Sequence, residues 1–304
     1  MTSLTWLGDR LQMSLPRLTL LPMAERKHAP QRLHLQARAK AIPRPVQTAE
    51  VTSISRISQG VRWRTEAMRS YDRPVLIWFT RGQGRITISG CSGGYGAHSA
   101  VFLPAGTMHG FTVTPAVLGS VVRLSARDWP VEPVHLRLRE VHLHRELTGM
   151  IDAIEREQTI DADGKTRAIA HHEGLLSIWF DRTQAATPIT EQANVKSSTA
   201  LRLTEAFTSL VERDFCHPLG VQHYAAQLGV TPTHLTRVCR IASGRAALDI
   251  LSDRRHFEAC RLLKDTDLAV SRIASQSGFA SPAYFTRAFR SKSGLSPTEF
   301  RHAR

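Results

Sequence analysis

Two stretches of this sequence place arginine side chains at matching positions. Residues 232–244 align with residues 282–294 at a constant offset of 50, and the alignment pairs Arg237 with Arg287. A guanidinium group donates hydrogen bonds in a planar fork, which fits the O6 and N7 atoms of guanine or the oxygens of a phosphate. The repeated pattern therefore indicates a surface that contacts nucleic acid at two places.

The spacing of side chains separates an apolar face from a polar face in each stretch. The apolar faces contain Leu235, Val238, Cys239 and Ala242 in the first copy, and Phe285, Ala288 and Phe289 in the second. On the polar faces we predict base contacts by Thr233, Thr236, Arg237, Ala283, Thr286 and Arg287, and phosphate contacts by Arg240, Arg245, Arg290 and Lys292. A solvated basic face is the alternative for one copy, but two matched copies argue against it.

The surrounding residues predict the helices that position these side chains. Each copy has a first helix, over residues 221–228 or 271–277, and then a tight turn and a second helix. A glycine follows each first helix, an N-cap residue and a proline begin each second helix, and a glycine ends it: Gly229, Thr231, Pro232 and Gly244, and then Gly278, Ser281, Pro282 and Gly294. This layout is typical of a helix-turn-helix unit.

A periodic stretch over residues 246–263 predicts a helix between the two units. A helix of that size is about 25 Å long. It could hold two recognition helices about one turn of DNA apart, since one turn is roughly 34 Å.

Residues 200–301 resemble the DNA-binding domain of the AraC/XylS family of bacterial transcription regulators. The most specific parts are the turn at Gly278-Phe279, the helix segment over residues 284–290 and the closing Gly294-Leu295-Ser296-Pro297. The resemblance implies a sequence-specific regulator, expected to be an activator. It also implies four partners: double-stranded DNA, a small-molecule effector of unknown identity, RNA polymerase and a second copy of the chain.

Composition and charge are consistent with two domains and a basic tail. The chain has 304 residues, 42% hydrophobic residues and a net charge of +14. Residues 1–50 hold 8 basic and 3 acidic side chains, residues 51–200 hold 17 and 14, and residues 201–304 hold 15 and 9. We predict a basic arm over residues 1–50, an effector-sensing and dimerisation domain over 51–183, a linker over 184–199 and a DNA-binding domain over 200–304.

The predicted compartment is the cytoplasm. The four cysteines are scattered without a Cys-x-x-Cys pair, which indicates buried thiols in a reducing environment. We expect no signal peptide, because charges interrupt the apolar runs near the start. No run of about 18 apolar residues occurs, so we expect no membrane span.

The middle of the chain changes to a strand pattern. Apolar or alternating runs at residues 75–80, 85–90, 100–103, 111–114 and 118–124 are separated by glycine and proline turns. This pattern predicts an antiparallel barrel built as a meander, and the whole chain as an α+β protein of two domains. Residues 104–109 resemble the second cupin motif, Pro-x-Gly-x-x-His, so the barrel is expected to be cupin-like with flanking helices.

A small barrel can hold one small ligand. The predicted effector pocket contains Trp78, Arg81, Phe102, His109 and Phe111. For His109 three roles stay open: capping a turn, contacting the effector or binding a metal. A metal site needs three or four converging ligands, and only His98 accompanies His109. We therefore expect no metal, cofactor or catalytic residue.

Residues 134–183 have two apolar stripes at helical spacing, the first beginning at Leu136 and Leu138. Packing on the barrel and pairing with a second subunit are both possible for these helices. The family resemblance implies a helical dimer contact here.

Two other functions compete with the regulator. One is a cupin-type metal enzyme, an isomerase or a dioxygenase, with a helical appendage. The other is an architectural protein that binds any duplex without sequence preference.

Overall fold

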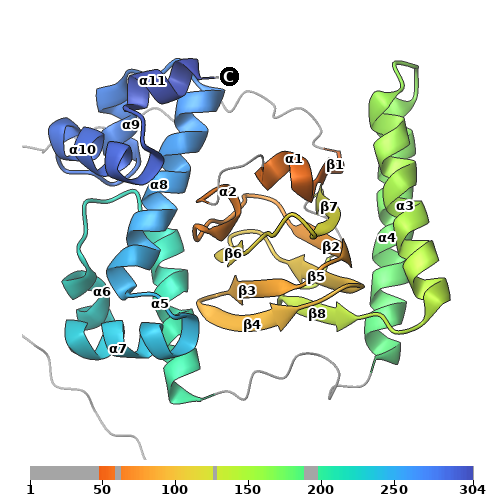
Figure 1. Cartoon of the computed structure of the whole chain (residues 1–304), viewed down its shortest axis with the longest axis horizontal. Helices are drawn as coiled ribbons and strands as arrows, with labels where there is room; N and C mark the ends of the chain where they lie inside the picture. The colour runs from red at the N-terminus through yellow and green to blue at the C-terminus, as the bar shows by residue number, and fades with distance from the viewer. Residues whose placement is uncertain (1–47, 59–62, 126–128, 188–197, 304) are drawn as a thin grey trace, which may run out of the picture. The chain divides into compact units, whose positions relative to one another are not determined.

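A computed structural model describes residues 48–58, 63–125, 129–187 and 198–303 (Figure 1). Nearly all of the predicted basic arm, and residues 188–197 of the predicted linker, lie outside the described residues. The described residues belong to one compact unit, Val46–Arg304.

The described strands form two antiparallel sheets. One has the order β1-β7-β2-β5-β8 and the other β4-β3-β6. The strands are β1 (Glu50–Ser53), β2 (Val75–Arg81), β3 (Gly84–Ile88), β4 (Cys91–Tyr95), β5 (Ser99–Leu103), β6 (His109–Phe111), β7 (Leu118–Arg123) and β8 (Val134–Arg137).

Three details of the sequence prediction are wrong here. The strands do not follow one another as a meander, because β7 pairs with both β1 and β2 and lies between them. The predicted barrel is not closed either, because no described strand of one sheet pairs with a described strand of the other. Residues 134–137 are a strand and not the start of a helix. Val134 and Leu136 are buried with a period of two, and Val134 pairs with Phe102 of β5.

Strand β2 separates two cores, because its successive side chains point to opposite faces of the sheet. Leu76 and Trp78 pack in a cluster with α3 (Val141–Thr159) and α4 (Lys165–Ala186). Ile77 and Phe79 pack in a cluster with β3, β6 and the short helix α1 (Ile54–Ser58). Another short helix, α2 (Trp63–Glu66), precedes β2.

The helices α3 and α4 lie side by side (Figure 1) and bury one stripe against the larger sheet. That stripe contains Leu147, Ile151, Ile154, Ile169, Leu176 and Phe180. Packing on the sheet, one of the two possibilities that the sequence left open, is therefore confirmed.

The C-terminal region is helical throughout its described length. Its helices are α5 (Thr199–Asp214), α6 (Val221–Gln227), α7 (Pro232–Ser243), α8 (Ala247–Asp265), α9 (Val270–Gln276), α10 (Pro282–Ser293) and α11 (Pro297–His302). The two helix-turn-helix units are α6 with α7 and α9 with α10, and α8 connects them. The predicted helices of both units are confirmed to within about a residue at each end.

The cysteines only partly match the prediction of buried thiols. Cys239 and Cys260 are buried, and burial raises the pKa of the Cys239 thiol to about 11. Cys91 is half-buried, and Cys216 is exposed because α5 ends two residues before it. All four are free thiols.

Two buried histidines, His109 and His256, and the half-buried His135 make stability depend on pH. Burial, followed by the charge of Arg69, lowers the pKa of His109 to about 3. Burial and Lys292 lower the pKa of His256 to about 3, and burial and Arg137 lower that of His135 to about 4. These folded-state pKa values lie below the ordinary value of 6.5. At pH values between them and 6.5, the unfolded chain therefore binds more protons than the folded chain. The contribution to stability is complete above pH 6.5 and is lost as the pH falls toward these values.

We expect the free energy of unfolding to fall below pH 6.5, by at most about 1.4 kcal/mol per pH unit for each histidine. His256→Gln should remove one of the protons taken up on unfolding, so the free energy of unfolding should change less steeply with pH. Urea unfolding at several pH values measures this slope. His142→Gln is the matched control, because the side chain of His142 is 61% exposed. An equal slope in the wild-type protein and His256→Gln would contradict the expectation.

Candidate nucleic-acid interface

The two second helices, α7 and α10, begin and end in the same way. The Thr231 hydroxyl accepts a hydrogen bond from the backbone N of His234 (3.2 Å), and the Ser281 hydroxyl accepts one from that of Tyr284 (3.3 Å). Each helix ends at a glycine with positive φ, which is 74° at Gly244 and 77° at the equivalent position of α10. These caps fix the start of each helix, so equivalent residues point in equivalent directions.

The predicted division of faces is confirmed by burial. The side chains of Leu235, Val238, Cys239, Ala242, Phe285 and Phe289 are buried, and Ala288 is half-buried. On the other faces, Thr233, Arg237, Arg240, Ala283, Thr286, Arg287 and Arg290 are exposed, and Thr236 is half-buried. Each helix therefore presents arginine side chains to solvent from a buried, rigid base.

The structure brings four predicted contact residues of the first unit together along one groove. Thr233, Thr236, Arg237 and Arg240 line a groove of about 800 Å³ between α7 and the start of α6. The Arg237 guanidinium donates from Nη2 to Nδ1 of His234 (3.2 Å), one turn earlier. A helix N-terminus with exposed donors beside it is the arrangement that recognition helices present to a major groove.

Two apolar side chains in the same groove were not predicted from the sequence. Ile241 and Leu248 line it and are 65% and 61% exposed. Apolar groups at such a position can contact the methyl group of thymine. The signal for Ile241 was an apolar residue directly after Arg240, on the face assigned to polar contacts. Leu248 belongs to the apolar periodicity that predicted the helix between the units.

The second unit exposes its predicted contact residues along α10. Among the described residues, neither Arg287 nor Arg290 has a side-chain hydrogen bond or an ion pair, so both guanidinium groups keep their donors. The Thr286 hydroxyl donates to the Pro282 carbonyl (3.0 Å), which leaves its oxygen as an acceptor. This face can therefore both donate to and accept from a base edge.

Two of the residues predicted to contact phosphate form ion pairs with a buried carboxylate that was not predicted from the sequence. Asp253 of α8 is 7% exposed, and its oxygens form ion pairs with Arg245 and Lys292. Its carboxylate also accepts from the backbone N of Met68 (3.3 Å). Asp253 thus connects the end of the first unit, the end of α10 and the residues before β2. The signal in the sequence was weak, because the buried residues of α8 also include Arg254 and His256.

The phosphate role of Lys292 stays a prediction. We expect Lys292→Ala to lower affinity about equally for all duplexes, and to reduce the slope of log K against log salt by about one. Fluorescence anisotropy at several salt concentrations measures both quantities. A changed sequence preference with an unchanged salt slope would instead assign Lys292 to the alignment of α10 through Asp253.

The five predicted effector-pocket residues do not share one site. Trp78 and Phe102 pack toward α3 and α4, whereas Phe111 belongs to the cluster between the sheets. His109 is buried on β6, and its Nδ1 donates to the Thr107 carbonyl (2.9 Å) in the preceding turn. Arg81 is exposed at the end of β2. Trp78 and Phe102 thus lie on the opposite side of the larger sheet from Phe111. The pattern of strands in the sequence does not reveal this difference, because it depends on how the strands pair.

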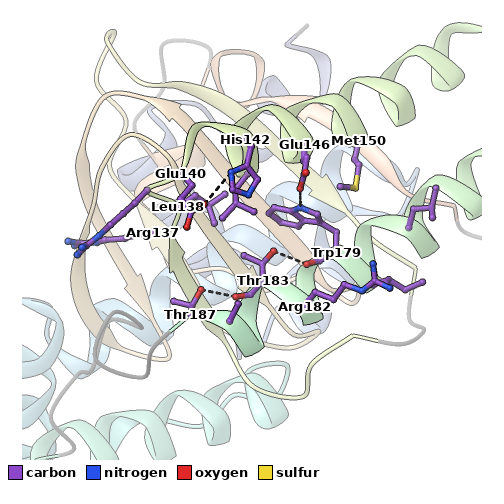
Figure 2. A pocket seen from close by; sticks show the side chains of 15 residues that line it. Arg137, Leu138, Glu140, His142, Glu146, Met150, Trp179, Arg182, Thr183 and Thr187 are labelled. Atoms are coloured by element: carbon purple, nitrogen blue, oxygen red, sulfur yellow. Dashed lines mark hydrogen bonds and ion pairs between the residues drawn. The ribbon is translucent and has the colours of Figure 1, made fainter.

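A groove of about 830 Å³ lies on the outer side of α3 and α4, next to β8 (Figure 2). The Trp179 indole lies in it and donates from Nε1 to the Glu146 carboxylate (2.8 Å). Leu175 and Ile178 also line it and are 60% and 47% exposed. The second helical stripe is therefore buried only in part.

The described part of the chain offers neither a cluster of metal ligands nor a membrane-spanning helix. Within residues 48–58, 63–125, 129–187 and 198–303, no group of three or more His, Cys, Asp or Glu side chains is arranged to hold a metal ion. No described helix is long and apolar enough to cross a membrane.

Comparisons with known proteins match the helical region of the chain, and a weaker similarity to solved structures extends over 83% of it. A family model described as "Helix-turn-helix domain" matches residues 224–303. The chain is 30% identical over 133 residues to the HTH-type transcriptional regulator GlxA of Rhizobium meliloti (strain 1021), covering 41% of this chain and 40% of GlxA. It is 32% identical over 83 residues to the probable transcription factor PqrA of Proteus vulgaris, covering 27% of this chain and 68% of PqrA.

Among solved structures, the chain is similar to an apo form of ToxT from Vibrio cholerae strain SCE256. The two are 16% identical, and the match covers 83% of this chain and 96% of ToxT with a TM-score of 0.44. The chain spans less than half of the length of GlxA.

Proposed function

Because the chain belongs to the AraC/XylS family of bacterial transcription regulators, we propose that it binds specific sequences of double-stranded DNA and regulates transcription near them. The observation that carries the proposal is the pair of identically capped helices, α7 and α10, which expose arginines at equivalent positions. This repeat supports a regulator rather than a metal enzyme.

The proposed contacts follow the two exposed faces. Arg237 and Arg287 donate to base edges, with the neighbouring Thr and Ala side chains beside them, and Arg240 and Arg290 donate to phosphates. The helix between the units, α8, has 19 residues and is about 28 Å long. That length is close to the roughly 34 Å between successive major-groove segments on one side of a duplex. The two units therefore suit two half-elements about one turn apart.

The remaining parts of the proposal concern the sheet domain and the partners. We propose that residues 51–183 form a cupin-like domain that binds a small-molecule effector, and that residues 200–304 bind DNA. The full regulator would act in the cytoplasm as a homodimeric activator that contacts RNA polymerase. The family supports these assignments as a group.

The experiment that tests the function is affinity selection of fragmented genomic DNA on the purified protein, followed by sequencing. Peaks that share a motif of two half-elements about one turn apart would support a specific regulator. Diffuse recovery that is lost evenly as salt rises would mean that the basic faces act only electrostatically. The neighbouring genes would then have no bearing on function.

The outer groove of α3 and α4 is the proposed contact with a second copy. We expect Leu175→Glu to convert dimers to monomers, because a charge at a buried contact between subunits is costly. Sedimentation equilibrium measures the change. Ala170→Glu is the control, since Ala170 is an exposed residue of α4 that does not line the groove. Equal dissociation constants for both variants would place the dimer contact elsewhere.

A further inference from the structure

A buried arginine of the sheet domain has no acidic partner among the described residues. Arg69 is 1% exposed, and among the described residues it takes part in no ion pair. Its one side-chain hydrogen bond to a described residue runs from Nη1 to the Arg64 carbonyl (2.6 Å), and its Nε has no partner there. A guanidinium group removed from water without a counter-ion is costly. The position therefore indicates a place for an anion.

A second buried polar atom that lacks a partner among the described residues lies on His109, which is also 1% exposed. Its Nδ1 is hydrogen-bonded to the carbonyl oxygen of Thr107. Because that oxygen can only accept, Nδ1 must carry the ring proton. Its lowered pKa keeps the ring neutral. The unpartnered Nε2 is consequently an acceptor, so it requires a donor and not a second anion.

These two side chains lie on the same face of one antiparallel bridge. The backbones of Arg69 and His109 exchange hydrogen bonds of 2.9 and 2.7 Å, and directly opposed residues project to the same side. The Tyr71 ring lies 5.9 Å from Cζ of Arg69 and 5.5 Å from the His109 ring, and the Phe111 ring lies 5.2 Å from the same Cζ. Two aromatic faces therefore flank the unpartnered donor and acceptor.

We propose that Arg69 and His109 bind a small organic acid that carries a hydroxyl group. The carboxylate accepts from Nε of Arg69, and the hydroxyl donates to Nε2 of His109. Tyr71 and Phe111 contact the apolar part of the molecule, and Tyr71, which is half-buried, is the wall nearest to solvent. This inference rests on the proposed effector function and deepens it by naming the chemical class of the effector.

The same bridge is linked to the DNA-binding helices. Met68 and Met108 precede the two residues in the chain and are buried in one cluster with Phe207 of α5, Tyr224 of α6 and Leu235 of α7. Gly110, next to His109, has no room for a Cβ, which would lie 2.7 Å from the Glu66 carbonyl oxygen. A ligand on one face of this closely packed bridge therefore changes the contacts of the methionines on the other side.

The test uses two matched sets of compounds on the full chain: mandelate, phenylacetate and mandelamide, and then lactate, propionate and lactamide. Isothermal titration calorimetry at millimolar ligand measures affinity. We expect at least one hydroxy acid to bind, its amide to bind roughly 10- to 100-fold more weakly, and its deoxy acid to bind several-fold more weakly. Arg69→Met should abolish the preference for acid over amide, and His109→Phe the preference for the hydroxyl. Arg56→Met, an exposed arginine of α1, should leave both preferences unchanged.

Three outcomes would overturn the inference: no acid of either set binds, the amides bind as well as the acids, or Arg69→Met retains the preference for acids. DNA selection on the same preparations separates this inference from the proposed function. Specific DNA recovery without acid binding removes only the site, whereas acid binding with diffuse DNA recovery removes only the regulator. A bound acid should change the affinity for the selected DNA by roughly fivefold or more, and an unchanged affinity would contradict the link through the methionines.

Discussion

Arg254→Met is expected to lower the free energy of unfolding by about 3–5 kcal/mol, because it breaks a buried ion-pair network from one side. The Arg254 side chain is 6% exposed and donates to both oxygens of Glu212 on α5 (2.6 and 3.0 Å). It also donates to Glu258 (3.2 Å) and lies 3.7 Å from the centre of the Phe215 ring. Methionine would fill much of the space but leave the half-buried carboxylate of Glu212 without its partner.

Urea unfolding of the full chain measures the loss. Arg261→Met is the matched control on the same helix, because Arg261 also pairs with Glu258 (2.6 Å) but its side chain is 49% exposed. Exposed ion pairs contribute about 0–1 kcal/mol, so the control should differ little from the wild-type protein. Replacing Glu212 by leucine in the Arg254→Met background should recover part of the loss. Equal losses in the two single variants would show that burial does not set the strength of this network.

Arg287→Ala is expected to cost about 1–3 kcal/mol of DNA-binding free energy, and to relax the preference for one base pair. The side chain is exposed on α10 and has no partner among the described residues. Its removal should therefore leave stability unchanged while it removes a bidentate donor. Arg237→Ala should have the same effect at the other half-element, since the caps of α7 and α10 are equivalent.

Competition with sequence variants of the selected DNA measures both the loss of binding free energy and the change in base preference. Arg202→Ala is the control, because Arg202 is exposed on α5, outside both helix-turn-helix units. It should leave the sequence preference unchanged. If Arg287→Ala lowers affinity equally for every sequence, Arg287 contacts phosphate and the assignment to bases is wrong.

The helical region was largely predictable because its signals are local. Thr231 and Ser281 cap helices, prolines occupy first-turn positions, and Gly244 and Gly294 adopt positive φ, all within a few residues of the boundary that they set. The division of Arg237 from Leu235 follows from helical periodicity alone. Because the unit occurs twice with matched arginines, its polar face could be interpreted as a nucleic-acid-binding surface.

The sheet domain was less predictable because pairing between strands is long-range. Strand β7 pairs with β1 and β2, and β8 pairs with β5, so the order of the sheet depends on contacts between segments far apart in the chain. Short strands such as β8 also give few residues from which a period can be read, and Leu136 and Leu138 fitted a helical stripe as well as a strand.

The amino-acid sequence alone therefore specified two capped recognition helices and the arginines that they expose, since both follow from periodicity and neighbouring residues. Tertiary packing decided which charges are free and which are bound. Asp253 holds Arg245, 8 residues before it, and Lys292, 39 residues after it. It also placed Arg69 opposite His109, 40 residues later, with a donor and an acceptor left unpartnered among the described residues. Asp253 meets Lys292, and Arg69 meets His109, only because segments distant in the sequence pack together, so chain order could not reveal either arrangement.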